Sequence, residues 1–485
     1  MKQRTAGDAA SATLAGIAEA GPRACDLLIR NGYLLTLDDE RRVFPDGAVA
    51  IGGTRILAIG PTREIESLYR PRQVIDAAGA AVHPGFIDGH YHATLHLTRG
   101  AISDRPAAPD SDSHAPNPYV AWLNALDDED EYASALMACV EMARNGFTGF
   151  VEVGTAFEPD CVAQAAEDVG LRASLGDPFV WDRVDCEQMA AQIPRAPAKR
   201  ARAERVLGQQ LKRNADPDAL VRGHVALYGI GTASDELILS AKALADANGV
   251  MLTLHQNFTK EDADFDRARF GRDPLVHFAE IGALGPNACF THMNVLSPAE
   301  IDAVAQSGLS VVWHPGNYMF YGIARQQLSP MPELHRRGTS LAFGADVAKL
   351  WAFGELGFIG YLVAREVGAF LSCESILEIS TLGGARAIGL QHELGALEPG
   401  KRADLVIRSN ELPDAQPNLD VVLQLVMISR TKSVDTVIVG GEIVVRKGRL
   451  TQLDEAAVYA RARASAARMA QRCNLPLGGP WPRSL

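Results

Sequence analysis

The chain has 485 residues, of which 47% are hydrophobic, and it carries a formal net charge of -12 at pH 7. That length exceeds one small core and accommodates an α/β barrel of about 250 residues together with a second module. The acidic balance is spread along the chain without a long acidic run, which argues against nucleic acid as a partner. The seven cysteines are scattered and never spaced as C-x-x-C, so they predict reduced thiols in a cytoplasmic protein.

The first 25 residues are predicted to form a flexible lead-in. They are rich in alanine but lack the continuous apolar core of a signal peptide. No later segment reaches the roughly 20 consecutive apolar residues that a membrane-spanning helix needs. We therefore expect no membrane partner.

Two β-rich segments lie near opposite ends of the chain, at residues 26–82 and 390–450. Their apolar runs are broken by turn signals, at Asn31-Gly32 and Gly52-Gly53 in the first segment and at Gly440-Gly441 in the second. Each segment can bury one of its faces only by packing against the other. We therefore expect a small composite β-sandwich domain, formed from both ends of the chain, with the middle inserted into it.

The middle of the chain, residues 83–389, alternates short apolar runs with longer helix-like stretches. This alternation predicts parallel strands joined by helices, and about eight such units fit a closed (β/α)8 TIM barrel of the α/β class. Ser234 and Ser297 mark helix starts, and Glu300 follows Ser297 at the spacing of a capping box. The last residues, 451–485, are predicted to form a C-terminal helix and tail.

Possible metal ligands end several of the predicted barrel strands. His90 and His92 stand two residues apart after an apolar run, so on a strand their side chains point to the same side. Residues at the carboxyl ends of barrel strands face the loops that shape the active site. Four further strand-like runs end at His255, His292, His314 and Asp346. Several imidazoles with one carboxylate suit a divalent transition metal ion that keeps one position open for water.

Motifs spread over most of the chain are similar to those of the amidohydrolase superfamily, in the branch of the s-triazine hydrolases and the cytosine and guanine aminohydrolases. They are PGFIDGHYH with the following TRG, the WHPGN that contains His314, the GAD that ends at Asp346, and TLGGARAIGLQHELGALEPGKRADLVI at residues 381–407. The motifs keep their order between residues 26 and 450.

The resemblance implies a role for each matching residue. His90, His92, His255 and Asp346 fall on the ligands of a single metal ion, and His292 falls on a histidine that contacts the attacking water or the substrate. Asp346 also takes a proton from that water and passes it to the leaving group. Zinc is the expected ion, although iron, cobalt and manganese accept the same ligands. The family further implies a small-molecule substrate and a homo-oligomer.

Two positions depart from the family pattern. In deaminating members, a glutamate that protonates the substrate's ring nitrogen follows the strand-five histidine by three residues, but Phe258 stands there in this chain. Tyr228 stands where many relatives have a substrate-binding histidine, and a hydroxyl with a pKa near 10 is a poor base at neutral pH. Another carboxylate would have to replace the missing acid, and the candidates are Glu152, Glu261 and Asp262.

The expected pocket suits a flat or apolar small molecule. Its candidate substrate-binding residues are His96, Tyr228, Phe258 and His314. Further aromatic surface is expected from Trp313, Tyr318 and Trp351. For His314 and several of the aromatic residues, a structural place in the barrel core is an equally good interpretation.

The missing acid discriminates among reactions. Ring deamination needs a proton delivered to a ring nitrogen, a contribution worth about 10² to 10⁴ in rate. Hydrolysis of an amide, carbamate, urea-like or thiocarbamate bond does not need a proton on a ring nitrogen. In that reaction the metal polarises the carbonyl, Asp346 moves the proton and His292 stabilises the oxyanion. The sequence therefore favours metal-dependent hydrolysis of a C–N or related bond.

Two alternatives stay open. One is an aminohydrolase (deaminase) or dechlorinase that acts on a heterocyclic ring with a recruited acid. The other is a non-catalytic scaffold or binding protein with the amidohydrolase fold. Retention of all four ligands argues against the scaffold, because convergent buried polar groups are costly to keep.

Overall fold

A ring of parallel strands forms the centre of the molecule, in a computed structural model that describes residues 21–99, 118–184, 189–347 and 351–475. Most of the predicted lead-in and the end of the predicted C-terminal tail lie outside these described residues. No helix in the described ranges has the length and hydropathy needed to span a bilayer.

The barrel consists of two sheets in which each pair of neighbouring strands is parallel. One sheet has the order β6-β7-β8-β9 and the other β10-β11-β12-β13-β14. Only His224 separates β9 from β10, so these two segments together occupy the fourth of eight strand positions. The ring closes where Tyr91 and Asp346 form a parallel bridge. The strands are β6 Phe86–Tyr91, β7 Phe147–Glu152, β8 Arg172–Leu175, β9 Val221–Gly223, β10 Val225–Gly229, β11 Leu252–Gln256, β12 Ala288–His292, β13 Ser310–Trp313 and β14 Leu341–Phe343.

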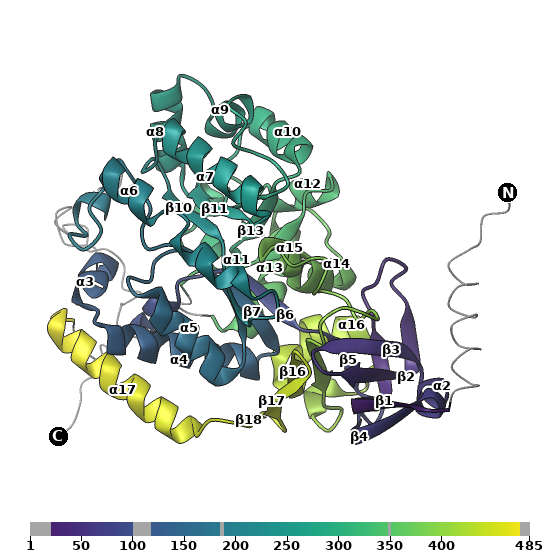
Figure 1. Ribbon diagram of the computed structural model, residues 1–485. Coiled ribbons are helices and arrows are strands. Elements are labelled where there is room, and N and C mark those ends of the chain that lie inside the picture. The colour runs from purple at the N-terminus through teal and green to yellow at the C-terminus, as the bar shows by residue number, and fades with distance from the viewer. Residues whose placement is uncertain (1–20, 100–117, 185–188, 348–350, 476–485) are drawn as a thin grey trace, which may run out of the picture.

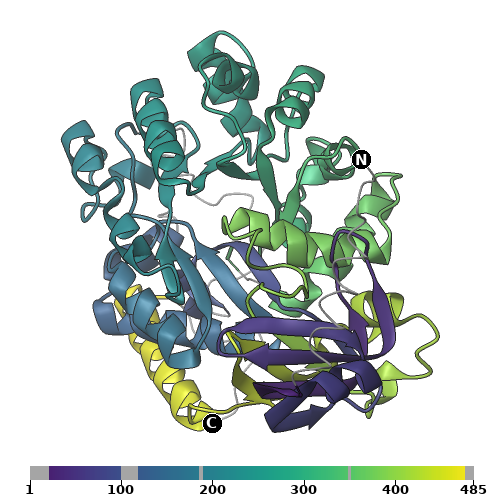
Figure 2. The ribbon, with the colours of Figure 1, turned by 45° about the vertical axis from the view of Figure 1, so that its right-hand side comes forward.

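Helices surround this ring, as Figures 1 and 2 show. The predicted helix starts are confirmed, because Ser234 accepts a hydrogen bond from the Leu237 amide at the start of α7, and Ser297 with Glu300 forms a capping box at α10. The helices are α3 Pro118–Ala125, α4 Asp128–Arg144, α5 Pro159–Val169, α6 Arg200–Val206, α7 Asp235–Asn248, α8 Lys260–Phe270, α9 Pro274–Glu280, α10 Pro298–Ser307, α11 Pro315–Phe320, α12 Met331–Arg336, α13 Leu356–Glu366, α14 Cys373–Glu378 and α15 Gly384–Ala387.

Strands from both ends of the chain form a second sheet beside the barrel. Its order is β18-β17-β16-β15-β5-β1-β2-β3, with β4 paired to β1. The antiparallel pairing of β15 with β5 joins the C-terminal strands to the N-terminal ones, as the composite domain requires. The pairing makes one nine-stranded sheet, and the two-layered sandwich stays a prediction. The elements are β1 Arg23–Leu35, β2 Val43–Gly52, β3 Arg55–Pro61, α2 Thr62–Leu68, β4 Tyr69–Asp76, β5 Ala81–Pro84, β15 Leu405–Arg408, α16 Val421–Leu423, β16 Val434–Val439, β17 Glu442–Arg446 and β18 Arg449–Leu450.

One of the three predicted turns in this sheet is wrong. Asn31-Gly32 lies inside β1, where Asn31 has a φ of 53° and the register with β2 shifts between Ile29 and Gly32. The dipeptide therefore makes a bulge that bends one long strand, because asparagine and glycine tolerate that backbone conformation in bulges as well as in turns. The other two signals are confirmed, since β2 turns into β3 at Gly53 and β16 into β17 at Gly440-Gly441.

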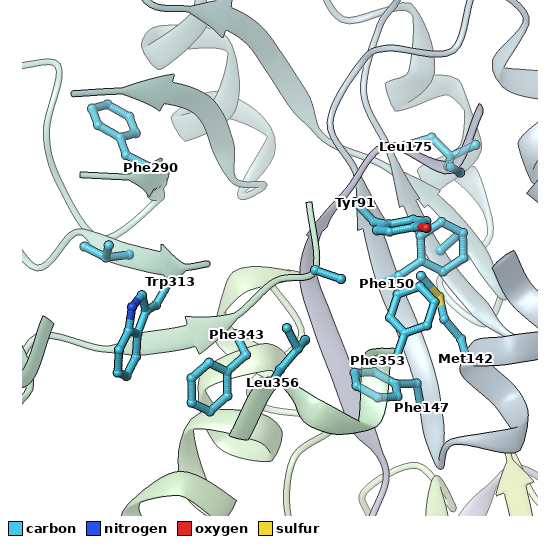
Figure 3. Packing of buried hydrophobic residues seen from close by; sticks show 14 of the residues in the cluster. Tyr91, Met142, Phe147, Phe150, Leu175, Phe290, Trp313, Phe343, Phe353 and Leu356 are labelled. Atoms are coloured by element: carbon cyan, nitrogen blue, oxygen red, sulfur yellow. The ribbon is translucent and has the colours of Figure 1, made fainter. Parts of the chain in front are cut away.

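Buried side chains hold the two parts together. Val406 of β15 and Val437 of β16 share one apolar cluster with Phe147 of β7, which packs on Phe353 of η5, the short helix Phe353–Glu355 (Figure 3). At the amino end of β8, Arg172 donates to both oxygens of Asp404 over 2.7 and 3.0 Å, and both side chains are buried. Asp404 directly precedes β15, so this ion pair links the barrel to the composite sheet.

The predicted C-terminal helix is α17, Glu455–Arg472, which lies along α4 (Figure 1). Buried Asp130 of α4 accepts hydrogen bonds from Ser465, Arg468 and Arg472 of α17. Met469 of the same helix is fully buried in a cluster beside the mouth of the barrel. The end of the chain therefore supports the face of the barrel that carries the polar strand ends.

Candidate metal centre and catalytic pocket

Four predicted ligands converge at the carboxyl ends of the barrel strands. His90 and His92 come from the end of β6, His255 from β11, and Asp346 follows β14. One possible ligand atom of each lies within 4.8 Å of the others. The Nε2 atom of His92 is 3.3 Å from that of His90, 3.4 Å from that of His255 and 2.8 Å from Oδ1 of Asp346. Four donor atoms this close together match the geometry of a single bound cation.

Neighbouring groups orient two of the imidazoles toward this point. Nδ1 of His255 donates to the Tyr228 carbonyl over 2.6 Å. Nδ1 of His92 lies 2.9 Å from Oγ1 of Thr155, whose hydroxyl donates in turn to Glu152 over 2.8 Å. Both histidines therefore carry their proton on Nδ1, which leaves the Nε2 lone pairs free for a metal ion.

The electrostatics of the site also fit a cation. Burial lowers the pKa of His255 to about 3 and holds the pKa of His90 well below its ordinary value, so both rings are neutral at pH 7. Burial opposes ionisation of Asp346, but the facing His92 and His90 outweigh it and hold the pKa of that carboxyl well below its usual range. Neutral imidazoles with one carboxylate are the protonation states that bind a divalent transition metal ion.

Asp346 is held on both sides. Its Oδ2 accepts a hydrogen bond from Asn317 of α11, and its backbone amide donates to the His90 carbonyl over 3.0 Å. The Asp88 side chain accepts from the amides of His90 and Ala345, so one buried carboxyl group ties the ends of the first and last barrel strands together. Asn317 lies within the WHPGN motif, but its role depends on a contact between two distant strand ends that the motif alone does not predict.

His292 stands beside the four ligands at the end of β12. The ring is buried, and its Nδ1 has no hydrogen-bond partner among the described residues. The Phe258 ring lies against it with centroids 4.4 Å apart. His292 and Asp346 both have positive φ values, 69° and 59°. Such strain in non-glycine residues concentrates at functional sites, where the surrounding structure enforces it.

A cavity of about 430 Å³ opens above these residues. Within the described ranges Asp346 is the one carboxylate in its wall, and aromatic and aliphatic side chains provide most of the rest. Tyr228 and Phe258 line it as predicted, whereas Tyr119, Met189 and Tyr321 had no motif to indicate them. The full lining is His92, Leu95, Tyr119, Leu123, Thr155, Met189, Tyr228, Ile230, His255, Phe258, His292, Tyr321, Asp346 and Val347.

Two predicted substrate-binding histidines lie outside this lining. Nδ1 of His314 donates to the Gly344 carbonyl over 2.7 Å, and its Nε2 bonds to Thr291. Nδ1 of His96 accepts from Tyr91 over 2.6 Å, and its Nε2 faces Glu141. Both are buried, and their ring nitrogens bond to protein groups, which favours structural roles.

The other expected wall residues and the candidate replacement acids also lie elsewhere. Trp313, Tyr318 and Trp351 belong to the barrel core cluster. Glu152 accepts from the Gly154 and Thr155 amides, Asp262 caps α8, and Glu261 is exposed beside Gln326. None of these six residues is part of the cavity lining.

Comparison with known proteins agrees with this geometry. The family model described as the amidohydrolase family matches residues 81–444, three quarters of the chain. The chain belongs to the amidohydrolase family. It is therefore a metal-dependent hydrolase that acts on carbon–nitrogen bonds other than peptide bonds, and the site described here is the part of the fold that fits this chemistry.

Relatives and solved structures extend the comparison over most of the chain. A 5-methylthioadenosine/S-adenosylhomocysteine deaminase of Syntrophobacter fumaroxidans is 29% identical over 91% of this chain and 98% of its own length. The crystal structure of an adenosine deaminase from Xanthomonas campestris with bound zinc superposes with a TM-score of 0.83 at 26% identity, covering 93% of this chain and 100% of that one. An atrazine chlorohydrolase from Arthrobacter aurescens, complexed with zinc, shares the fold with a TM-score of 0.76 at 21% identity, over 91% of this chain and 100% of that one.

Proposed function

We propose that the chain uses a zinc ion, held by His90, His92, His255 and Asp346, to hydrolyse an amide, carbamate, urea-like or thiocarbamate bond in a flat, largely apolar small molecule. The observation that carries the choice of bond is the cavity wall, which offers aromatic surface and, among the described residues, no carboxylate besides Asp346. The zinc-bound relative supports the choice of ion.

The residues of the site divide the work of such a hydrolysis. When bound, a divalent cation lowers the pKa of water toward 7 and polarises the carbonyl that is attacked. Asp346 takes the proton from the attacking water and returns it to the leaving nitrogen, since its second oxygen is held by Asn317 and its first faces the ligand cluster. His292 has an unused ring nitrogen beside the cluster and is placed to contact the oxygen on which charge develops.

A second candidate is deamination of a heterocyclic amine, and the names of the relatives favour it. The Syntrophobacter and Xanthomonas proteins are both named as deaminases of adenosine-type compounds. The observation against it is Phe258, whose ring packs on His292 at the place where an acid would protonate the ring nitrogen. A deaminating enzyme would need a proton donor from the substrate, from water or from residues beyond the described ranges.

A substrate screen with zinc-loaded protein separates the two candidates. Amides, carbamates, ureas and thiocarbamates are assayed for the released amine, and aminated or halogenated heterocycles for ammonia or halide. We expect turnover of the carbonyl compounds, with activity lost on chelation and restored by zinc. Rapid ammonia release across heterocyclic amines, without turnover of any carbonyl compound, would make the deaminase reading correct.

The Phe258→Glu variant tests the same choice from the protein side. A carboxyl group at this place supplies the missing acid, so we expect ring deamination to appear or rise while hydrolysis of the carbonyl substrate does not increase more than a few-fold. Phe258→Leu is the control, because it removes the ring without adding an acid. A large gain on the carbonyl substrate with Phe258→Glu alone would contradict the proposal. The predicted homo-oligomer is tested separately by light scattering.

A further inference from the structure

A second cavity, of about 40 Å³, lies where the barrel meets the composite sheet. It shares no lining residue with the catalytic pocket. Apolar side chains provide most of its wall, and Figure 3 labels Phe147, Phe343, Phe353 and Leu356, which come from β7, β14, η5 and α13. One water molecule needs only about 10–15 Å³ on the same measure, so the cavity has room for a small occupant.

Two arginines also line this cavity, and in the described part of the chain no carboxylate does. Arg408, the last residue of β15, is only 3% exposed. Its Nε donates to Nε2 of His83 over 2.9 Å, and its Nη1 donates to the Arg430 carbonyl and to Ser433. These hydrogen bonds leave Nη2 without a hydrogen-bond partner among the described residues, and the guanidinium carbon lies 5.5 Å from the centre of the Phe86 ring.

The positive charge of Arg408 is not balanced by its neighbours. Nδ1 of His83 donates to the Pro84 carbonyl over 2.7 Å, so its Nε2 is the neutral acceptor of the Arg408 bond and brings no negative charge. Arg430 has an ion-pair partner in Glu355 at 3.2 Å, but its Nε is buried and has no hydrogen-bond partner among the described residues. Arg408 therefore brings a positive charge without a carboxylate partner to the cavity wall, and one N–H group on each arginine has no hydrogen-bond partner among the described residues.

We propose that this cavity binds one small monovalent anion of the chloride type, held between the guanidinium groups of Arg408 and Arg430. An uncompensated buried charge is strongly unfavourable, and an anion that accepts the two unused N–H groups removes both penalties at once. The phenyl and aliphatic walls favour a weakly hydrated halide over phosphate or sulfate, which need more hydrogen-bond donors than these walls offer.

The proposed anion is structural and independent of the hydrolytic reaction. Arg408 belongs to the composite sheet, Phe86 and Phe147 to the barrel, and Arg430 to the connection before β16. An ion at their meeting point stabilises the junction between the two parts. Its loss is expected to lower the melting temperature without changing the metal content of the catalytic site.

The test is a comparison of thermal stability in chloride and in gluconate, a bulky and strongly hydrated carboxylate, at the same ionic strength. Chloride raised from 2 to 200 mM with gluconate as the balancing anion is expected to raise Tm by about 2 to 3 °C, because ligand binding stabilises by mass action. Arg408→Met is expected to abolish this dependence. Arg72→Met is the matched control, since Arg72 of the same sheet has a side chain that is 84% exposed, and its Tm is expected to respond like that of the wild type. Equal Tm values of the wild-type protein in both salts would overturn the proposal.

A bromide derivative gives a second measurement that needs no variant. Crystals of the wild-type protein grown in bromide are expected to show an anomalous scattering peak between Arg408 and Arg430. Water-level density without an anomalous signal at this place would refute anion binding. If Arg408→Met does not fold, the wild-type salt series and this peak decide together.

Discussion

The two ends of the barrel bury polar side chains in opposite ways. At the amino ends of the strands, Arg172 and Asp404 satisfy each other through two hydrogen bonds and need nothing from outside the chain. At the carboxyl ends, three imidazoles and Asp346 direct their lone pairs at one point, and His292 keeps an unused nitrogen beside them. The difference shows which buried polar cluster serves stability and which one is built for a ligand, because only the second is incomplete without one.

The largest expected effect is the loss of catalysis in Asp346→Asn. Asparagine keeps the size of the side chain and its place beside Asn317, but it cannot take up a proton and brings no charge to the metal. We expect kcat/KM for the best substrate of the screen to fall about 10³-fold or more, and zinc to bind more weakly. Steady-state kinetics and metal analysis measure this, with thermal unfolding as the control for folding. A fall of less than tenfold would contradict the assigned role of Asp346.

At the amino ends of the barrel strands, breaking the ion pair of Arg172 and Asp404 is expected to affect stability alone. Arg172→Met leaves Asp404 as an uncompensated buried charge, and we expect a loss of about 3–5 kcal/mol in the free energy of unfolding. Urea denaturation measures it, and zinc content should stay unchanged. The double variant Arg172→Met/Asp404→Leu removes both charges and should recover most of the loss. A single variant within about 1 kcal/mol of the wild type would show that the pair does not hold the junction.

Acid should destabilise the barrel through His224, which lies between β9 and β10. The ring is buried between the Ser174 and Thr253 hydroxyls, and burial lowers its pKa to about 3. In the unfolded chain the His224 imidazole takes up a proton below its ordinary pKa of about 6.5, whereas in the folded chain it does not. The free energy of unfolding therefore has its full value above that pH and falls as the pH drops from about 6.5 toward 3. At pH 4.5 this one group lowers the unfolding free energy by about 3 kcal/mol.

The His224→Asn variant isolates that contribution. Asparagine offers hydrogen bonds to the same hydroxyls but does not titrate. The difference in unfolding free energy between the wild type and the variant should be constant above pH 7.5 and shrink or reverse as the pH approaches 4.5. A difference that does not change with pH would show that His224 is protonated in the folded state as readily as in the unfolded one.

The smallest expected effect concerns the orientation of a ligand. Thr155→Val keeps the shape of the side chain but removes the hydroxyl that holds Nδ1 of His92, so we expect zinc affinity to fall about 10- to 100-fold. Competition with a chromophoric chelator measures it. Thr381→Val is the matched control, because Thr381 is equally buried but its hydroxyl bonds to the Leu377 carbonyl of its own helical segment. Equal losses in both variants would indicate a general effect on stability.

The sequence predicted those parts of the molecule that depend on local patterns. Strands ending in His90, His255 and Asp346 could be recognised because apolar runs of strand length stop at a polar residue, and parallel strands bring such residues to one end of a barrel. Ser297 with Glu300 predicted a helix start because both halves of a capping box are local. The Asn31-Gly32 signal failed because the same two residues serve a bulge as well as a turn.

What the sequence could not predict depends on contacts between distant segments. His314 and His96 have the same strand-end or motif positions as real cavity residues, and only their bonding to Gly344 and Tyr91 distinguishes them. Met189 and Tyr321 line the cavity from connecting segments without any periodic pattern. The surroundings of the buried Arg408 could not be predicted either, because His83 and Arg408 are brought together only by the pairing of β5 with β15.

The backbone bridge that closes the ring has a consequence for the order of folding. The Asp346 amide donates to the His90 carbonyl and the Asp346 carbonyl accepts from the His92 amide, although more than half of the chain separates these residues. The fourth ligand therefore joins the other three only after all the intervening strands have been synthesised. A nascent or truncated chain that ends before Asp346 lacks the only negatively charged ligand. We therefore expect tight metal binding only of the completed barrel, so that metal content would report the fraction of molecules in which this long-range closure has succeeded.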